Sequence, residues 1–338
     1  MRVARITKQS LRDWAGHAAV AALLTAVFWA SYGCGPGDGD RDGSAGGTAA
    51  REPAVPIRPV SNPTPPTGTG VPDETREVVE TRRVVAYGEA EAAYLERRYG
   101  DAVDLFTVYT ESKPDNPWGF YMLGLAAWKA GDHVTSEEAF ERALERDPGH
   151  VKSLLNLSRV LLETGRAGDA LVRIEEALGV GPESGDAFRL QGRALSELGR
   201  SDEAIEAYGE AILLNDQDAW SMNNLGLLLI QDGRHEEALQ PLARAVQIDS
   251  TIAVFHNNLG IALEVTGHHE QATQAYRRAL ELDGSYEKAS VNLSRVEQLE
   301  PKPGVEPVDL EMLAEEFVAQ IGRWRESPDS TTVPEVEN

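Results

Sequence analysis

The sequence predicts an all-α protein built as a solenoid of stacked antiparallel helix pairs, and three observations lead to this prediction. The chain from Pro117 to Tyr286 divides into five consecutive frames of 34 residues that align without a gap. Small residues and large apolar residues keep fixed positions in every frame, and the fifteenth position is always glycine. A unit of this length cannot bury its own apolar face, so neighbouring units must stack.

Two positions of the frame indicate how the helices of a pair meet. The eighth position is small in every frame: Gly124, Ser158, Gly192, Gly226 and Gly260. The twenty-fourth position is large and apolar in every frame: Phe140, Ile174, Tyr208, Leu242 and Tyr276. Two helices approach closely only where facing residues are small, and the glycine at position fifteen is expected to cap the first helix. Pro241 interrupts one second helix, where it should cost a hydrogen bond and introduce a kink.

This pattern resembles the tetratricopeptide repeat (TPR), column by column, over about two-thirds of the chain. The resemblance implies a right-handed superhelical solenoid with five tandem repeats over residues 117–286. A looser copy over residues 74–116 predicts an irregular first helix pair, and residues 287–300 resemble a capping helix. In this family the first helix of each pair lines the concave surface.

The first 33 residues are expected to direct the chain to a membrane. A basic start is followed by an apolar run without formal charge from Ala15 to Gly33, and Cys34, the only cysteine, comes next. The stretch Ser31-Tyr32-Gly33-Cys34 resembles the lipobox of bacterial lipoproteins, although Ser31 replaces the usual Leu and Tyr32 is bulky. The resemblance implies a lipid on Cys34 and a place in the bacterial cell envelope, facing outside the cytoplasm, with the outer membrane favoured over the inner. The alternative is an uncleaved single-pass anchor in the inner membrane.

The segments that flank the array have their own signatures. Residues 34–73 are rich in Gly and Pro and predict a disordered linker. Residues 308–325 carry an apolar stripe at helical spacing and predict an amphipathic helix. That helix is expected to pack on the end of the array as a cap, or to dock a partner. Residues 326–338 predict a disordered acidic tail.

Charge and motif content exclude several classes of function. The formal net charge is −23, which argues against binding nucleic acid or an anionic lipid surface. His133, His235 and His269 share position seventeen of their frames and are expected to pack between helices rather than bind metal. The sequence contains no nucleophile motif and no phosphate-binding loop. We therefore expect no enzyme activity, no cofactor, no metal and no small-molecule substrate.

Nine residues are expected to line the concave groove: Trp118, Tyr121, Asn156, Arg159, Arg189, Arg193, Asn224, Asn258 and Asn292. The asparagines at position six resemble the asparagine column of TPR grooves, and an amide both donates and accepts, so it can pair with a peptide backbone of any sequence. The arginines would attract an acidic segment. The alternatives are local helix contacts for the asparagines and pairing with Glu163 and Glu197 for the arginines.

Together these features predict a non-enzymatic, membrane-tethered scaffold or assembly adaptor that binds extended polypeptide segments of other proteins, acidic segments among them. The alternative is a substrate-recruiting subunit of an envelope enzyme, such as a transferase or a cell-wall hydrolase complex, whose catalytic part lies on another chain.

Overall fold

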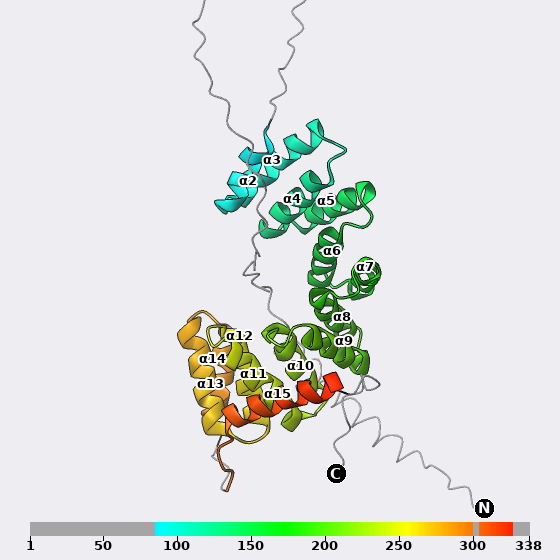
Figure 1. The fold of residues 1–338 in the computed structure, drawn as a ribbon. Helices are drawn as coiled ribbons and strands as arrows, with labels where there is room; N and C mark the ends of the chain where they lie inside the picture. Colours follow the sequence, from blue (N-terminus) through cyan, green and yellow to red (C-terminus); the bar gives the residue numbers. More distant parts are fainter. Residues whose placement is uncertain (1–84, 300–303, 327–338) are drawn as a thin grey trace, which may run out of the picture. The chain divides into compact units, whose positions relative to one another are not determined.

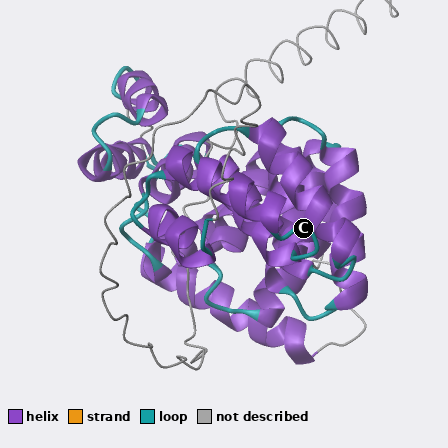
Figure 2. Cartoon of the chain, turned by 90° about the horizontal axis from the view of Figure 1, so that it is seen from above, coloured by secondary structure: helices purple, strands orange, loops and turns teal. Residues whose placement is uncertain are grey.

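The structure is a computed structural model that describes residues 85–299 and 304–326. The expected signal or anchor, the expected linker with Cys34, and the tail beyond residue 326 lie outside these residues. The described part of the chain is helical and contains no strand (Figure 2). None of its helices has both the length and the apolar character that crossing a membrane requires.

The five frames each fold into two helices (Figure 1). The first helices are α4 (Pro117–Lys129), α6 (Val151–Glu163), α8 (Gly185–Glu197), α10 (Ala219–Gln231) and α12 (Ala253–Val265). The second helices are α5 (His133–Arg146), α7 (Ala167–Val180), α9 (Ser201–Leu214), α11 (His235–Ile248) and α13 (His269–Leu282). Each first helix contacts its own second helix and the first helix of the next pair, which is the stacked arrangement that the repeat predicts.

Glycine at position fifteen ends every first helix. Gly131, Gly165, Gly199, Gly233 and Gly267 all have positive φ, between 73° and 94°. A side chain at such a φ is strained, so glycine is the residue that turns the chain there without cost. The second helix then begins two residues later, at position seventeen, in all five frames.

The closest approach within a pair lies between positions eight and twenty-four. A Cβ atom added to Gly124 would lie 2.6 Å from the Phe140 ring, and one added to Gly226 would lie 2.4 Å from Cγ of Leu242. Phe140 and Leu242 are fully buried. The large side chain therefore fills the space that the missing Cβ leaves, and this contact sets the spacing of the two helices.

Shorter or single helices stand at both ends of the five pairs. Before them, α2 (Tyr87–Leu95) and α3 (Tyr99–Ser112) form a pair around the buried ring of Phe106, which meets Tyr87 edge to face at 5.7 Å. After them, α14 (Glu287–Val296) packs against α12 and α13. The side chain of Glu264 on α12 receives two hydrogen bonds from Arg295, at 2.7 and 2.8 Å, which fasten α14 to the last pair.

The C-terminal helix α15 (Leu310–Glu326) does not cap the end of the array, so the expectation for its packing was wrong. It crosses the second helices instead, with its main contact on α11 and a smaller one on α9 (Figure 1). Three polar contacts fix it, one from each of three successive pairs: Gln271 with Val308, Gln240 with Glu316, and Asp216 with Arg325. The helix therefore links three consecutive pairs, the third to the fifth.

The reason lies in the outward positions of α11. Positions twenty-one and twenty-five of this frame are Leu239 and Ala243, which are 2% and 4% exposed. The same positions hold Glu137 and Glu141 in the first frame, Leu171 and Glu175 in the second, and Thr273 and Arg277 in the fifth. In the third frame they are Ile205 and Gly209, on α9, which α15 also contacts. Burial of the α15 stripe is favourable only against an outward face without charges, so the helix lies on α11 and reaches α9.

Pro241 lies inside α11, which runs from His235 to Ile248 without interruption. Proline has no N–H, so the helical hydrogen bond from this position cannot form. Pro241 is buried, and it lies two residues from both Leu239 and Ala243, so it is on a different side of α11 from these two outward residues.

Candidate functional site

All nine residues expected in the groove lie on first helices, from α4 to α14. We call the surface formed by positions two, five, six and nine of these helices the first-helix face. Stacking brings the same positions of successive frames next to one another, since each first helix contacts the next. Side chains of successive repeats therefore lie in rows along the first-helix face.

Asparagines from three helices of this face form one hydrogen-bonded chain, which we call the asparagine ladder. From donor to acceptor it runs through Asn292, Asn257, Asn258, Asn223 and Asn224. The two bonds that cross between helices are 2.9 Å long, and the two between sequence neighbours are 3.2 Å long. The ladder ties α10, α12 and α14 together along the face.

Asn223 and Asn257 are members that the sequence analysis did not single out. They occupy position five, directly before the expected asparagines, and are 3% and 2% exposed. The doubled Asn-Asn at the same place in two successive frames was the available signal. Each crossing bond joins position six of one frame to position five of the frame before it, so both positions are needed.

The ladder does not use the full bonding capacity of its amides. A primary amide carries two N–H donors and an oxygen with two lone pairs. Each internal member of the ladder gives one N–H and accepts at its oxygen once. The second N–H of each amide is thus not committed to the ladder.

Asn156 is separate from the ladder and binds within its own helix. Its Nδ2 donates to the carbonyl of Lys152 at 2.8 Å, and its Oδ1 accepts from Nη1 of Arg159 at 3.1 Å. For this asparagine, the contacts are local ones within α6.

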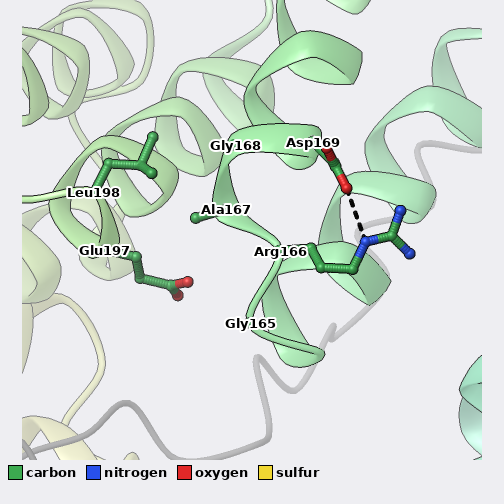
Figure 3. Close-up of a pocket in the computed structure, with 7 residues that line it drawn as sticks. All are labelled: Gly165, Arg166, Ala167, Gly168, Asp169, Glu197 and Leu198. Carbon is green, nitrogen blue, oxygen red and sulfur yellow. Dashed lines mark hydrogen bonds and ion pairs between the residues drawn. The ribbon is translucent and has the colours of Figure 1, made fainter.

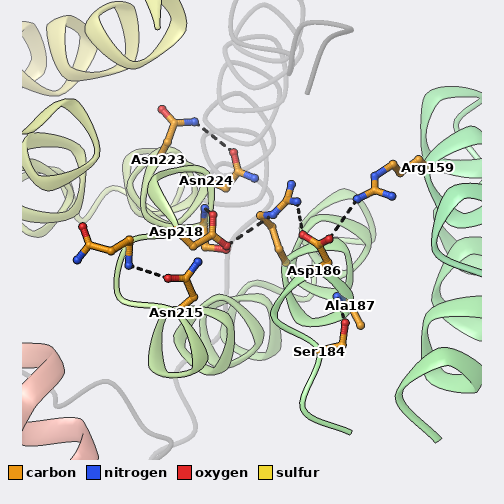
Figure 4. A network of polar contacts seen from close by, with 11 residues as sticks. Arg159, Ser184, Asp186, Ala187, Asn215, Asp218, Asn223 and Asn224 are labelled. Carbon is orange, nitrogen blue, oxygen red and sulfur yellow. Dashed lines mark hydrogen bonds and ion pairs between the residues drawn. The ribbon is translucent and has the colours of Figure 1, made fainter. Parts of the chain in front are cut away.

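The central arginines meet carboxylates of the same chain (Figure 4). Arg189 donates to Asp186 at 2.7 Å and lies 3.6 Å from Asp218. Arg193 pairs with Glu197 at 3.1 Å, as the alternative for these arginines expected. Carboxylates of the same chain therefore neutralise most of the positive charge in the middle of the face.

Arg159 is satisfied less well than the other two arginines. It is 6% exposed, yet the nearest carboxylate, that of Asp186, lies 3.8 Å away. Its Nε is buried and has no hydrogen-bond partner in the structure. Glu163, the partner considered for these arginines, instead accepts from Trp128 Nε1 at 2.8 Å and lies 3.2 Å from His133.

The two acids of this cluster differ in their pKa directions. Partial desolvation alone would raise the pKa of Asp186, but the charge and hydrogen bond of Arg189 and the charge of Arg159 together lower it. Burial raises the pKa of Glu197, because the opposing influence of Arg193 is smaller. Asp186 therefore remains ionised to lower pH than a free aspartate, and its ion pairs persist.

An aromatic cluster marks the other end of the face. The rings of Trp118, Tyr121 and His150 meet edge to face at 4.9 to 5.5 Å. Trp118 is 46% exposed, and Nζ of Lys152 lies 5.6 Å from its ring centroid. A half-exposed indole beside an exposed lysine is a surface that a peptide side chain can cover.

A hollow of about 370 Å³ opens between the start of α7 and the end of α8 (Figure 3). It is lined by Gly165, Arg166, Ala167, Gly168, Asp169, Glu197 and Leu198. Arg166 is already held by Asp169 at 2.8 Å and by Glu137 at 2.6 Å. Among the described residues, no group of three His, Cys, Asp or Glu side chains is placed to hold a metal ion.

Comparison with known proteins agrees with the fold. Family models described as tetratricopeptide repeat match residues 121–184, 162–219, 189–251 and 253–286. No curated protein matches the sequence.

Solved structures share the architecture at low identity. A tetratricopeptide repeat protein from Parabacteroides merdae has a TM-score of 0.54 and 13% identity, and the match covers 62% of this chain and 82% of that chain. A chain of the APC/C heterotetramer Cut9–Hcn1 has a TM-score of 0.55 and 15% identity, covering 61% and 41%. A thermophilic TPR protein in Thermus thermophilus has a TM-score of 0.49 and 20% identity, covering 54% and 100%.

The chain is a tetratricopeptide repeat protein. The sequence prediction of this family and of stacked helix pairs is confirmed. The matching models describe repeats that are usually non-catalytic, and none of them is a catalytic family.

The ladder predicts a graded effect of removing single amides. Asn257→Ala takes away a donor and an acceptor, so the oxygen of Asn258 and an N–H of Asn292 both lose their partners. Each buried group left unsatisfied costs about 1–3 kcal/mol. We expect a clear fall in the thermal unfolding midpoint. Asn224→Ala is the matched control, because Asn224 is only half-buried and ends the ladder. Equal effects of the two substitutions would contradict the ladder.

Proposed function

We propose that this TPR protein is a non-enzymatic interaction scaffold that holds an extended segment of a partner protein along its first-helix face. The observation that carries the proposal is the asparagine ladder, which aligns amides from three successive repeats. The uncommitted N–H groups of half-buried Asn224 and of Asn258, which is 6% exposed, are the ones we propose to meet carbonyls of an extended backbone. Several such bonds must act together, because each contributes only about 0.5–1.5 kcal/mol net.

The arrangement of charges limits how many acidic side chains of a ligand the face can bind. Arg189 and Arg193 already have carboxylate partners, so a long acidic segment would compete with them. Arg159 has the most distant carboxylate and an unpartnered Nε. We therefore propose one acidic side chain of the ligand beside Arg159, with the aromatic cluster around Trp118 holding an apolar side chain further along.

This proposal predicts the effect of removing an exposed anchor. Trp118→Ala should weaken a selected peptide about tenfold, the typical effect of truncating an aromatic anchor. Val134→Ala is the control, because Val134 is 71% exposed and lies on the second helix α5. Peptides selected on the full chain in detergent supply the probes, and fluorescence anisotropy gives the affinities. Equal binding to both variants would remove the aromatic cluster from the site.

We also propose that the chain is tethered to a membrane of the bacterial cell envelope and faces outside the cytoplasm, with the outer membrane favoured over the inner. The support is the order of basic start, apolar run and single Cys34 in the sequence. The Gly- and Pro-rich residues 34–73 would then separate the array from the membrane surface.

Lipidation has a direct readout. The mature protein is expected to begin at Cys34 and to carry a diacylglyceryl group there, and intact-mass spectrometry of protein extracted from membranes measures both. Cys34→Ser should keep the leader and lose the lipid mass. A parent chain that retains Met1 with an unmodified Cys34 would favour the single-pass anchor.

A further inference from the structure

The contact between α15 and the array is separate from the first-helix face. Positions 297–309 join α14 to α15, so the helix is reached by a connection and is not part of a repeat. Its inward stripe of Ala314, Phe317 and Ile321 is 1% to 2% exposed. The apolar outward face of α11 lies beneath it, built from Leu239 and Ala243. The outer side of the array therefore presents one patch fitted to an amphipathic helix.

The two polar contacts made by α15 itself are exposed and weak, whereas the two hydrogen bonds between Gln271 and Val308 are part-buried and lie before the helix begins. Arg325 and Asp216 pair at 2.9 Å, but their side chains are 49% and 44% exposed. Exposed ion pairs contribute little, because water competes for both charges. Gln240 and Glu316 also bond at an exposed edge. The apolar stripe is therefore the main contribution to the binding of α15. Another helix with a similar stripe can make the same contact.

Two buried donors in this region lack acceptors. Nε1 of Trp324 on α15 and Nε of Arg244 on α11 are both buried, and neither has a hydrogen-bond partner in the structure. Both belong to the Asp216 end of the contact. Trp324 precedes Arg325, which bonds Asp216, and the charge of Arg244 is among the influences that lower the pKa of Asp216. Each buried donor without an acceptor lowers the stability of the state in which α15 is bound, compared with a state in which the donor has a partner.

We propose that the outward face of α11 is a docking surface for an amphipathic helix of a partner protein, and that α15 is its displaceable occupant. The partner helix carries a Leu/Phe/Ile stripe like that of α15. It places a carboxylate where α15 has Trp324, and this carboxylate accepts the hydrogen bond that Nε of Arg244 lacks. Because α15 is tethered at high effective concentration, the partner must bind more tightly than α15 does. This surface is independent of the ligand of the first-helix face.

The test uses the full chain in detergent in three forms. The parent has α15 free to exchange. Phe317→Ala weakens the stripe, and Gln240→Cys with Glu316→Cys, bridged by a short bismaleimide, fixes α15 in place. The probe is a fluorescein-labelled peptide of residues 308–326, in its native sequence and with Trp324→Glu. Binding is read by fluorescence anisotropy, and circular dichroism verifies that each chain is folded.

We expect the peptide to bind the Phe317→Ala chain at least about tenfold more tightly than the parent, and not to bind the bridged chain. Arg244→Ala in the chain should weaken the Trp324→Glu peptide at least about threefold more than it weakens the native peptide, because only the substituted peptide offers Arg244 an acceptor. Val318→Ala, on the exposed side of α15, is the matched control and should behave as the parent.

Failure of the peptide to bind the Phe317→Ala chain would overturn the docking surface. So would equal binding to the bridged and Phe317→Ala chains. An equal effect of Arg244→Ala on the two peptides would overturn the role given to Arg244.

Discussion

The close approach of position eight to position twenty-four is the constraint on which the other contacts depend. Gly226 lies against Leu242, and Gly260 lies against the ring of Tyr276, so closely that a single added Cβ would overlap the neighbour. This contact fixes how far apart the two helices of a pair lie, and hence how far one first helix lies from the next. A large residue at position eight would push the helices apart and move every residue of the first-helix face.

The regular spacing explains why the polar contacts can form between repeats. Both crossing bonds of the asparagine ladder join residues 35 positions apart, one frame plus one residue. Hydrogen bonds tolerate only a few tenths of an ångström in length, so a ladder across α10, α12 and α14 requires helices at equal spacing. α15 adds a second restraint on the opposite side, where it links the same region from Asp216 to Gln271.

The periodic sequence predicts the fold class, the helix pairs and the helix on which each groove residue lies. It does so because the period, the small positions and the turn glycine are all local signals. The sequence predicts less about which side chains contact one another. Asn257 and Asp218 matter through contacts with neighbouring repeats, and the sequence does not show which side chains meet across a stack. The position of α15 was missed for a similar reason. A comparison of the outward positions of all frames finds no charge in the third frame, with Ile205 and Gly209, or in the fourth, with Leu239 and Ala243, and α15 contacts the second helices of these two frames.

A double-mutant cycle on Gly226 and Leu242 tests the spacing contact most directly. Gly226→Ala should cost about 1–3 kcal/mol of unfolding free energy in the parent, because the new methyl overlaps Leu242. In a Leu242→Ala background the same substitution should cost nothing, or stabilise by about 0.5–1 kcal/mol through helix propensity. Gly209→Ala, in α9 with open space around the added Cβ, provides the reference for propensity alone. Equal costs of Gly226→Ala in both backgrounds would contradict the account.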